Sequence, residues 1–191
     1  SPIHYDKDGD DHYDLLSAFQ KSIRGSDPDA SIFYLAKLLA SKDLISPCRR
    51  LLVIASEDIG LAYPQAGAIV KSLVDSALQL GLPEARIPLA EATLFLATAP
   101  KSNSAISAID LALEDINNGL GKEIPSHLKD GHYSGATKLN HSNNYLYPHS
   151  YPNHYVKQEY LPSDISYRVY YMYGKNKVEE AAKKYWDLIK H

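Results

Sequence analysis

Apolar residues recur at three- and four-residue spacing through most of the first 118 residues, which predicts a series of amphipathic α-helices. Glycines, Ser-Pro and Ser-Asp-Pro sequences and further prolines separate these stretches, as is typical of helix ends and helix starts. The predicted apolar faces are Leu15, Leu16, Phe19 and Ile23; Ile32, Leu35, Ala36 and Leu39; Leu51, Ile54 and Ala55; Ala66, Ile69, Val70, Leu73, Ala77 and Leu80; Leu89, Ala92, Phe95, Leu96 and Ala99; and Ile106, Ile109, Leu113 and Ile116. Such helices, joined by short turns, predict an all-α, multi-helix bundle. Gly25 is expected to end the first helix in the left-handed conformation.

The composition changes at Gly119, and residues 119–174 are rich in Gly, Asn, Ser, Pro, Tyr and His without helical periodicity. Ten of the 15 tyrosines fall in this segment, whereas disordered linkers are poor in aromatic residues. We therefore expect an ordered, irregular segment that lies across the helices with its phenol rings packed inward. A last amphipathic helix is predicted over 177–190. The expected organisation is a helical segment at 1–60 and a helical domain at 61–191, which share one core.

The overall composition is that of a soluble globular protein, with 45% hydrophobic residues, 23% charged residues and a net charge of −3. This charge argues against a dedicated nucleic-acid coat protein, and no apolar stretch is long enough to cross a membrane. The sequence shows no signal-peptide pattern and no initiator methionine, so we expect a piece of a longer cytoplasmic protein. Cys48 is the single cysteine, which excludes an internal disulfide and a cysteine-rich zinc module.

A search for a nucleotide-binding loop gives a negative result. Such a loop needs a glycine-rich turn for the phosphates, a lysine, and a hydroxyl residue for the magnesium ion. Gly-Lys pairs occur at 121–122 and 174–175, but neither has the preceding glycine or the Ser/Thr. The acidic run at 6–11 lacks the EF-hand positions of glycine and glutamate, so we interpret it as a solvated lead-in to the first helix. We predict no cofactor site and no catalytic residue in this chain.

Histidines gather late in the chain, at His127, His132, His141, His149 and His154. Two pairs have four residues between their members, which is within the range of zinc ligands. Thiolate partners are missing, and no predicted helix holds two of these histidines on one face. We therefore favour structural or surface histidines and predict no metal site.

Two arginines directly follow the single cysteine, and two carboxylates come nine and ten residues after it. Cys48 lies in the first turn of a predicted helix beside Arg49 and Arg50, features that lower a thiol pKa. No neighbouring base or oxyanion site is evident, so a buried, unreactive cysteine is favoured. Glu57 and Asp58 are adjacent carboxylates that diverge by about 100° on a helix. An acid–base pair is one alternative, but we favour an ion pair of Glu57 or Asp58 with Arg49, Arg50 or a neighbouring subunit.

The tyrosine-rich segment also carries basic residues, and aromatic rings interleaved with cations can stack on and follow single-stranded DNA. The candidate contacts to DNA or a partner are Lys138, Lys157, Arg168 and Lys175. The alternative is that the tyrosines are the core of this segment. We favour that alternative, because an open stacking surface would leave an irregular segment with little to bury.

Several stretches together carry a family resemblance. They are 11–30 (DHYDLLSAFQKSIRGSDPDA), 49–62 (RRLLVIASEDIGLA), 99–103 (APKSN), 124–128 (IPSHL) and 160–162 (YLP). The chain resembles the C-terminal portion of the RarA/MgsA family of AAA+ ATPases, which includes the eukaryotic Werner helicase-interacting proteins. The resemblance covers essentially the whole chain.

The resemblance implies a helical domain similar to the clamp-loader collar, which holds the parent protein as a homotetramer. It also implies that the Walker motifs, the arginine finger and the sensor arginine lie upstream, so that ATP and magnesium bind to the parent protein outside this chain. Family members are DNA-dependent ATPases of replication-fork maintenance, recombination and repair. They associate with single-stranded DNA-binding protein, which implies a nucleoid-associated location in the cytoplasm.

Three interpretations follow from these observations. The first is an oligomerisation module without enzymatic activity of its own. The second is a module that binds single-stranded DNA or a partner protein through the Tyr/Lys-rich last third. The third, an independent helical enzyme that uses Cys48 or the histidine cluster, is the least favoured.

Overall fold

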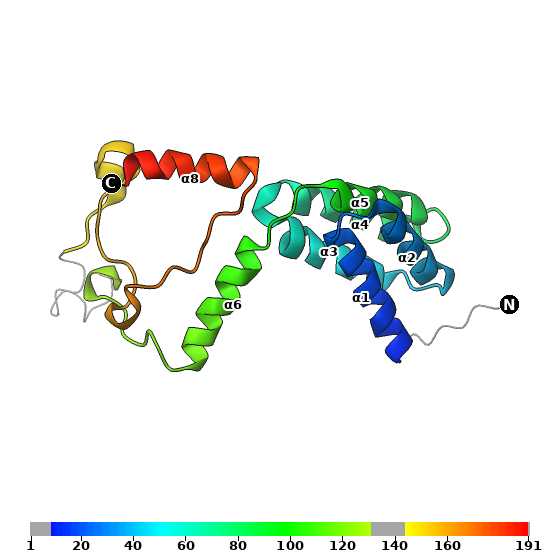
Figure 1. Ribbon diagram of the computed structural model, residues 1–191, viewed down its shortest axis with the longest axis horizontal. Coiled ribbons are helices and arrows are strands. Elements are labelled where there is room, and N and C mark those ends of the chain that lie inside the picture. The colour runs from blue at the N-terminus through cyan, green and yellow to red at the C-terminus, as the bar shows by residue number, and fades with distance from the viewer. Residues whose placement is uncertain (1–8, 131–143, 191) are drawn as a thin grey trace. The chain divides into compact units, whose positions relative to one another are not determined.

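The computed structural model describes residues 9–130 and 144–190, which form helices and short turns with no strand among them (Figure 1). The predicted all-α class is confirmed, and each of the helices expected from the apolar periodicity is present. The α-helices are α1 (Asp10–Arg24), α2 (Pro28–Ala40), α3 (Ile45–Ile54), α4 (Ala66–Leu80), α5 (Arg86–Thr98), α6 (Ser104–Asn117) and α8 (Lys177–Ile189). Among these residues, no helix is both long enough and apolar enough to span a bilayer.

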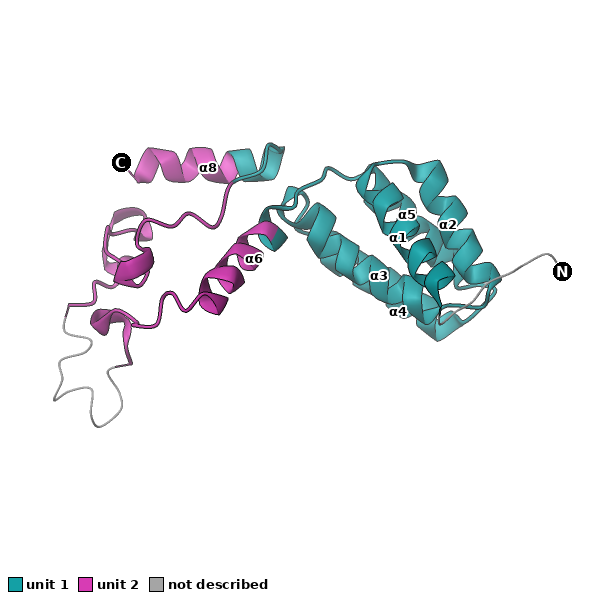
Figure 2. Ribbon diagram, turned by 60° about the horizontal axis from the view of Figure 1, so that its bottom comes forward, with its two compact units in different colours: residues 1–106, 173–180 teal, residues 107–172, 181–191 magenta. Residues whose placement is uncertain are grey.

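The chain forms two compact units, which Figure 2 shows in different colours. Unit 1 comprises residues 1–106 and 173–180, and unit 2 comprises residues 107–172 and 181–191. The domain boundary predicted after residue 60 falls inside unit 1, in the turns that connect α3 to α4.

Unit 1 is built on one hydrophobic core between α1, α2, α3, α4 and α5. The largest fully buried apolar side chains are Phe19, Ile23, Leu38, Leu51, Ile54, Ile59, Leu89, Leu96 and Val70. Most of them belong to the faces predicted from the sequence. Each such side chain contributes about 1.5–3 kcal/mol when it leaves water. The first five helices therefore form a bundle around one hydrophobic core.

The end of α1 differs from the prediction by one residue. Gly25 has φ −79°, and the left-handed residue is Ser26, at φ 60°. The Ser26 amide donates to the Ile23 carbonyl at 3.0 Å, and the Asp27 amide donates to the Ser22 carbonyl at 3.0 Å. This is the hydrogen-bond pattern of a Schellman motif with serine at its left-handed position. Asp27 then caps α2 by accepting from the Ala30 amide at 2.9 Å.

The end of α2 repeats the motif, with Lys42 as the left-handed residue at φ 64°. The Lys42 amide donates to the Leu39 carbonyl at 2.9 Å, and the Asp43 amide donates to the Leu38 carbonyl at 3.2 Å. The buried Asp43 carboxylate accepts from the Ser46 amide at 3.1 Å and so satisfies an amide in the first turn of α3. The Ser-Pro sequence at 46–47, a predicted helix start, lies in the first turn of α3.

Replacing Lys42 with glycine should raise the melting temperature, because glycine adopts a left-handed φ without the steric cost that a Cβ brings. We expect a gain of about 0.5–1 kcal/mol, measured by chemical denaturation. Lys37→Gly, inside the same helix, is the matched control and should destabilise by about 1 kcal/mol. A lower stability for Lys42→Gly would contradict this account of the helix end.

Unit 2 is less regular. It contains most of α6, the larger part of α8, and a long segment with the short 3₁₀ turns η3 (Ser126–Leu128), η4 (Pro148–Ser150), η5 (Pro152–His154) and η6 (Ser163–Ile165). The prediction of an ordered, irregular segment is confirmed for its described part. The prediction that its phenol rings pack inward is wrong there, because the described tyrosines are exposed or half-buried. Tyr133 lies outside the described residues.

Candidate functional site

The predicted carboxylate pair lies in a π-helical turn that extends α3, η1 (Ala55–Ile59). Gly60 ends this turn at φ 46°, a conformation that favours glycine. π-turns within helices occur frequently at functional sites. Arg24, on α1, contacts both carboxylates: Nε donates to Asp58 Oδ1 at 2.6 Å, and Nη2 donates to Glu57 Oε2 at 2.9 Å. The predicted pairing of Glu57 and Asp58 with Arg49 or Arg50 is therefore corrected: the partner is Arg24.

The second Asp58 oxygen is also occupied, since Gln20 Nε2 donates to Oδ2 at 3.1 Å. Arg50 joins the cluster indirectly, because its Nη1 donates to Gln20 Oε1 at 3.1 Å. Arg49 is exposed. The hydrogen bond to Asp58 raises the pKa of Arg24, although burial acts in the opposite direction. Asp58 is 5% exposed and held on both oxygens, so the cluster joins α1 to the π-turn.

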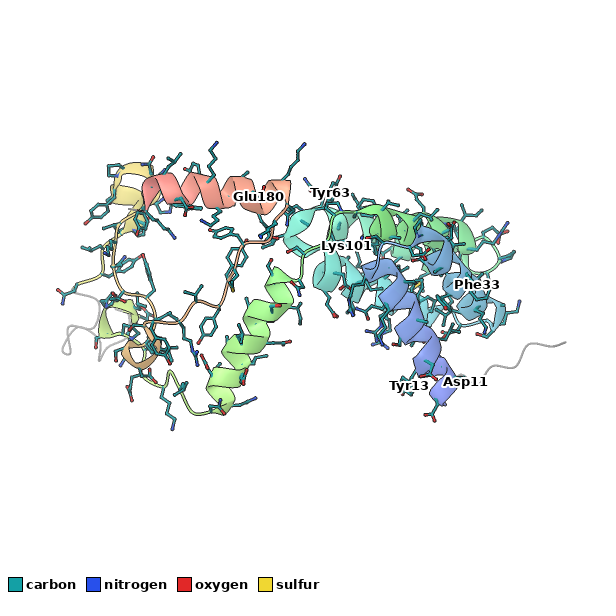
Figure 3. The ribbon with its side chains drawn as sticks, in the orientation of Figure 1. Asp11, Tyr13, Phe33, Tyr63, Lys101 and Glu180 are labelled. Carbon is teal, nitrogen blue, oxygen red and sulfur yellow. The ribbon has the colours of Figure 1, made fainter. Side chains whose placement is uncertain are left out.

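Lys101 connects the end of α5 to the turn between α1 and α2 (Figure 3). Its Nζ donates to the carbonyl oxygens of Ala97 and Ala99 at 3.2 and 2.6 Å and to Ser26 Oγ at 2.9 Å. Burial lowers the pKa of Lys101. The lysine thus satisfies carbonyl groups left free at the end of α5. This contact gives the sequence APKSN, at 99–103, a structural role.

A buried carboxylate that sequence reasoning missed lies at the start of α8. Glu179 is 1% exposed and accepts hydrogen bonds on both of its oxygens. The donors are Ser102 Oγ at 2.5 Å, Ser104 Oγ at 2.7 Å, Asn176 Nδ2 at 2.8 Å and the Gly174 amide at 3.0 Å. Burial alone would raise the pKa of Glu179, but these donors lower it to about 2. All five residues belong to unit 1, so this cluster fixes residues 173–180 within it.

Glycine is required at position 174 because the side chains of Glu179 and Ser102 approach its backbone closely. A Cβ there would lie 2.5 Å from Glu179 Oε1 and 3.0 Å from Ser102 Oγ. The short motif Gly-Lys-Asn at 174–176 places both a backbone and a side-chain donor before the helix, and this is the local signal that could have found the cluster.

In unit 2, Asp115 holds the irregular segment against α6. Arg168 donates to both oxygens of Asp115 at 2.8 Å, and the Tyr170 hydroxyl donates to Oδ2 at 2.6 Å. The Tyr170 hydrogen bond lowers the pKa of Asp115 against its desolvation, and Arg168 contributes in the same direction. Arg168, a predicted DNA contact, therefore uses its guanidinium to anchor the segment that returns past α6.

The other predicted contacts to DNA or a partner do not come together in one place among the described residues. Lys157 is exposed in unit 2 and Lys175 is exposed in unit 1, whereas Lys138 lies outside the described residues. Near Lys157 in sequence, Tyr155 packs edge-on against Trp186, and Lys190 Nζ lies 5.5 and 5.2 Å from the two ring centroids. This arrangement is a cation–π cluster on the surface of unit 2.

The histidines and the cysteine form no reactive centre in the described part of the chain. His149 and His154 lie with their Nδ1 atoms 3.1 Å apart, but no third His, Cys, Asp or Glu among the described residues completes a metal-binding group. His127 contacts the Glu159 carbonyl at 2.7 Å, and His132 and His141 lie outside the described residues. Burial, with a smaller effect from Asp43, raises the pKa of the Cys48 thiol to about 11. The thiol is therefore protonated at neutral pH.

Helix α6 carries an exposed apolar stripe in unit 2. Ile109, Leu113 and Ile116 lie at i, i+4 and i+7 and are 53%, 49% and 64% exposed. Asp115, which binds Arg168 and Tyr170, faces roughly the opposite side of the helix. Among the described residues, Ile165 is the one hydrophobic residue of unit 2 that is buried.

Comparison with known protein families identifies the class of protein to which the chain belongs. The family model described as "AAA C-terminal domain" matches residues 1–24, and the model "MgsA AAA+ ATPase C terminal" matches residues 25–190. The chain therefore belongs to the RarA/MgsA family of AAA+ ATPases, of which it represents the C-terminal part.

Relatives from bacteria and a eukaryote agree with this assignment. The chain is 55% identical over 186 residues to replication-associated recombination protein A of Bacillus subtilis, covering 97% of the chain and 44% of that protein. It is 36% identical over 169 residues to the protein of the same name from Escherichia coli K12, covering 87% and 38%. It is 32% identical over 171 residues to ATPase WRNIP1 of Dictyostelium discoideum, covering 88% and 20%. The chain thus spans less than half the length of these relatives.

Proposed function

We propose that this chain is the self-association module of a RarA/MgsA-type AAA+ ATPase and that it assembles as a homotetramer. The observation that supports the proposal is the uncovered stripe of Ile109, Leu113 and Ile116 in a unit that has almost no buried apolar residue in its described part. A unit of this size gains little stability without a core of its own. Covering the stripe with another copy would supply the missing apolar contacts.

The contribution of such an interface would be substantial. Completing the burial of a large aliphatic side chain is worth about 1.5–3 kcal/mol, reduced here because each residue is already half covered. Several residues per interface, repeated around a closed tetramer, would offset part of the entropy lost on association. By contrast, unit 1 already has a hydrophobic core of its own.

The module would act by holding ATPase domains at the spacing that lets one complete the active site of another. ATP and magnesium would bind upstream in the parent protein, which would act as a DNA-dependent ATPase at stalled replication forks. Association with single-stranded DNA-binding protein and with the nucleoid belongs to the same proposal. The names of the relatives, which refer to replication-associated recombination and to an ATPase, support this context.

Light scattering coupled to size exclusion, across a dilution series of the 191-residue chain, tests the proposal. A mass near four chains that persists to low micromolar concentration is the expected result. A monomer at every concentration would contradict self-association within these residues.

A second candidate function is binding of single-stranded DNA or an acidic partner by unit 2. Its support is the group of exposed aromatic side chains Tyr145, Tyr147, Tyr151, Tyr160 and Tyr167. Stacking on such rings is sequence-tolerant and accompanies salt-dependent contacts to phosphates. Fluorescence anisotropy with labelled oligothymidylate should show binding that weakens with salt and with Tyr160→Ala. Absence of binding at low salt would exclude it for the isolated chain.

A further inference from the structure

Unit 1 carries an open apolar groove between α2 and the start of α5 that no part of the described chain fills. Its volume is about 770 Å³. The lining residues are Ile32, Leu35, Ala36, Leu39, Ala40, Lys42, Leu82, Pro83, Arg86, Ile87 and Ala90. Three of these are alanines, which leave room for the backbone of another helix to approach closely. The groove therefore has the shape and lining of a helix-binding site.

The groove is positively charged at one end. Lys42 follows α2 and Arg86 begins α5, and both charged residues that line the groove are cations. Arg86 Nη1 donates to the Pro83 carbonyl at 2.8 Å, which holds the guanidinium at this end. A segment that docks here should present an apolar stripe edged by carboxylates.

Helix α6 has these properties. Its sequence, SAISAIDLALEDIN, contains three carboxylates and no lysine or arginine. Asp115 is engaged by Arg168 and Tyr170, whereas Asp110 and Glu114 are exposed and border one edge of the stripe that contains Ile109 and Leu113. The stripe from Ile109 to Ile116 extends about 10 Å along the helix, and the α2 wall from Ile32 to Ala40 extends about 12 Å.

We infer that α6 of one copy docks in the α2–α5 groove of the next copy, with Asp110 and Glu114 near Lys42 and Arg86. This inference rests on the proposed self-association and specifies its geometry. The contact is heterologous, because each copy offers a different surface on its two sides. Four such contacts that close produce a ring with C4 symmetry. Two α6 helices packed against each other in an isologous dimer would instead bring carboxylates together without a cation on either helix.

Charge exchange across the interface tests the inference. The groove variant carries Lys42→Glu and Arg86→Glu, and the helix variant carries Asp110→Lys and Glu114→Lys. Each variant alone should associate at least about tenfold more weakly than the wild type in sedimentation velocity at 0.1 M salt. An equimolar mixture should recover association to within about threefold, because every interface in an alternating ring then joins opposite charges. Lys37→Glu, an exposed α2 change outside the groove lining, should have no effect.

The outcomes separate this inference from the proposal on which it rests. If the wild type is a monomer, both are wrong. If the wild type assembles and the groove variant assembles equally well, or the mixture stays dissociated, the docking of α6 in the groove is wrong while self-association stands. Circular dichroism and the melting temperature of each variant show that unit 1 is folded, so that a loss of association is not a loss of structure.

Discussion

Glu179→Ala should destabilise unit 1 by about 3–4 kcal/mol, because it removes the acceptor for a set of buried donors. The Gly174 amide, the Asn176 amide group and the hydroxyls of Ser102 and Ser104 all donate to this carboxylate. Glu179 is 1% exposed, so water cannot replace it without opening the structure. We expect a lower melting temperature and faster hydrogen exchange at residues 173–180.

Glu179→Gln should lie between the wild type and the alanine variant. A glutamine keeps one oxygen but presents an NH₂ group where the other oxygen was. Oε1 accepts from Asn176 Nδ2, and Oε2 accepts from the Gly174 amide. Either orientation of the new amide therefore places its NH₂ against one of these donors. The serine hydroxyls can rotate and accept instead, which explains why the loss should be partial.

The same carboxylate gives unit 1 a characteristic acid sensitivity. Its pKa is lowered from an ordinary 4.5 to about 2 in the folded chain. A lowered folded-state pKa means that the stabilisation is fully present above the unfolded pKa and is lost as the pH falls from about 5 toward 2. The amount is about 3 kcal/mol. The loss of stability between pH 5 and pH 3 should therefore be smaller in Glu179→Gln than in the wild type.

Glu180→Gln is the matched control, since Glu180 is the next residue of α8 and is exposed (Figure 3). It should leave the melting temperature and its pH dependence nearly unchanged. Equal effects of the two glutamine variants would show that the buried cluster does not stabilise unit 1.

The helices could be predicted because the information that defines them is local. The apolar residues of α1, for example, recur every three or four positions, and Phe19 and Ile23 are buried as this pattern requires. The positions of the helix ends were predicted less accurately. Gly25 was the expected left-handed residue, but that residue is Ser26, directly before the Asp27 that caps α2.

The polar clusters could not be predicted, because their partners are far apart in sequence. Arg24 and Asp58 are 34 residues apart, and Ser102 and Glu179 are 77 residues apart. Periodicity indicates which side of a helix is buried, but it contains no information about which buried carboxylate meets which donor. The π-turn was not predicted either. Within it, Glu57 and Asp58 both contact the Arg24 guanidinium, although an ideal α-helix separates adjacent side chains by about 100°.

The tyrosine-rich segment shows where a correct signal led to a wrong structural conclusion. Its aromatic content correctly indicated order in the part that the structure describes, where Arg168 and Tyr170 bind Asp115. Inward packing was expected on the assumption that one chain must cover its own aromatic side chains. The described tyrosines of this segment are exposed or half-buried, and the α6 stripe is exposed, so this chain does not cover them.

Leu113→Asp should abolish self-association of the chain. The substitution places a charge in the middle of the apolar stripe, and burying that charge in an interface without a partner is costly. The neighbouring stripe residues Ile109 and Ile116 would remain but could no longer be covered without desolvating the new carboxylate. We expect the dissociation constant to rise by about 100-fold or more, as for a central residue of an interface. Sedimentation equilibrium over a dilution series measures this change.

Leu111→Asp is the matched control on the same helix. Leu111 is 45% exposed, close to the value of Leu113, but it lies about 160° around the helix from it. Both substitutions remove the same side chain and add the same charge, so they affect helix propensity and solubility alike. Dissociation by Leu113→Asp alone would assign the interface to the stripe. Equal dissociation by both variants, or by neither, would show that the stripe is not the surface that joins the copies.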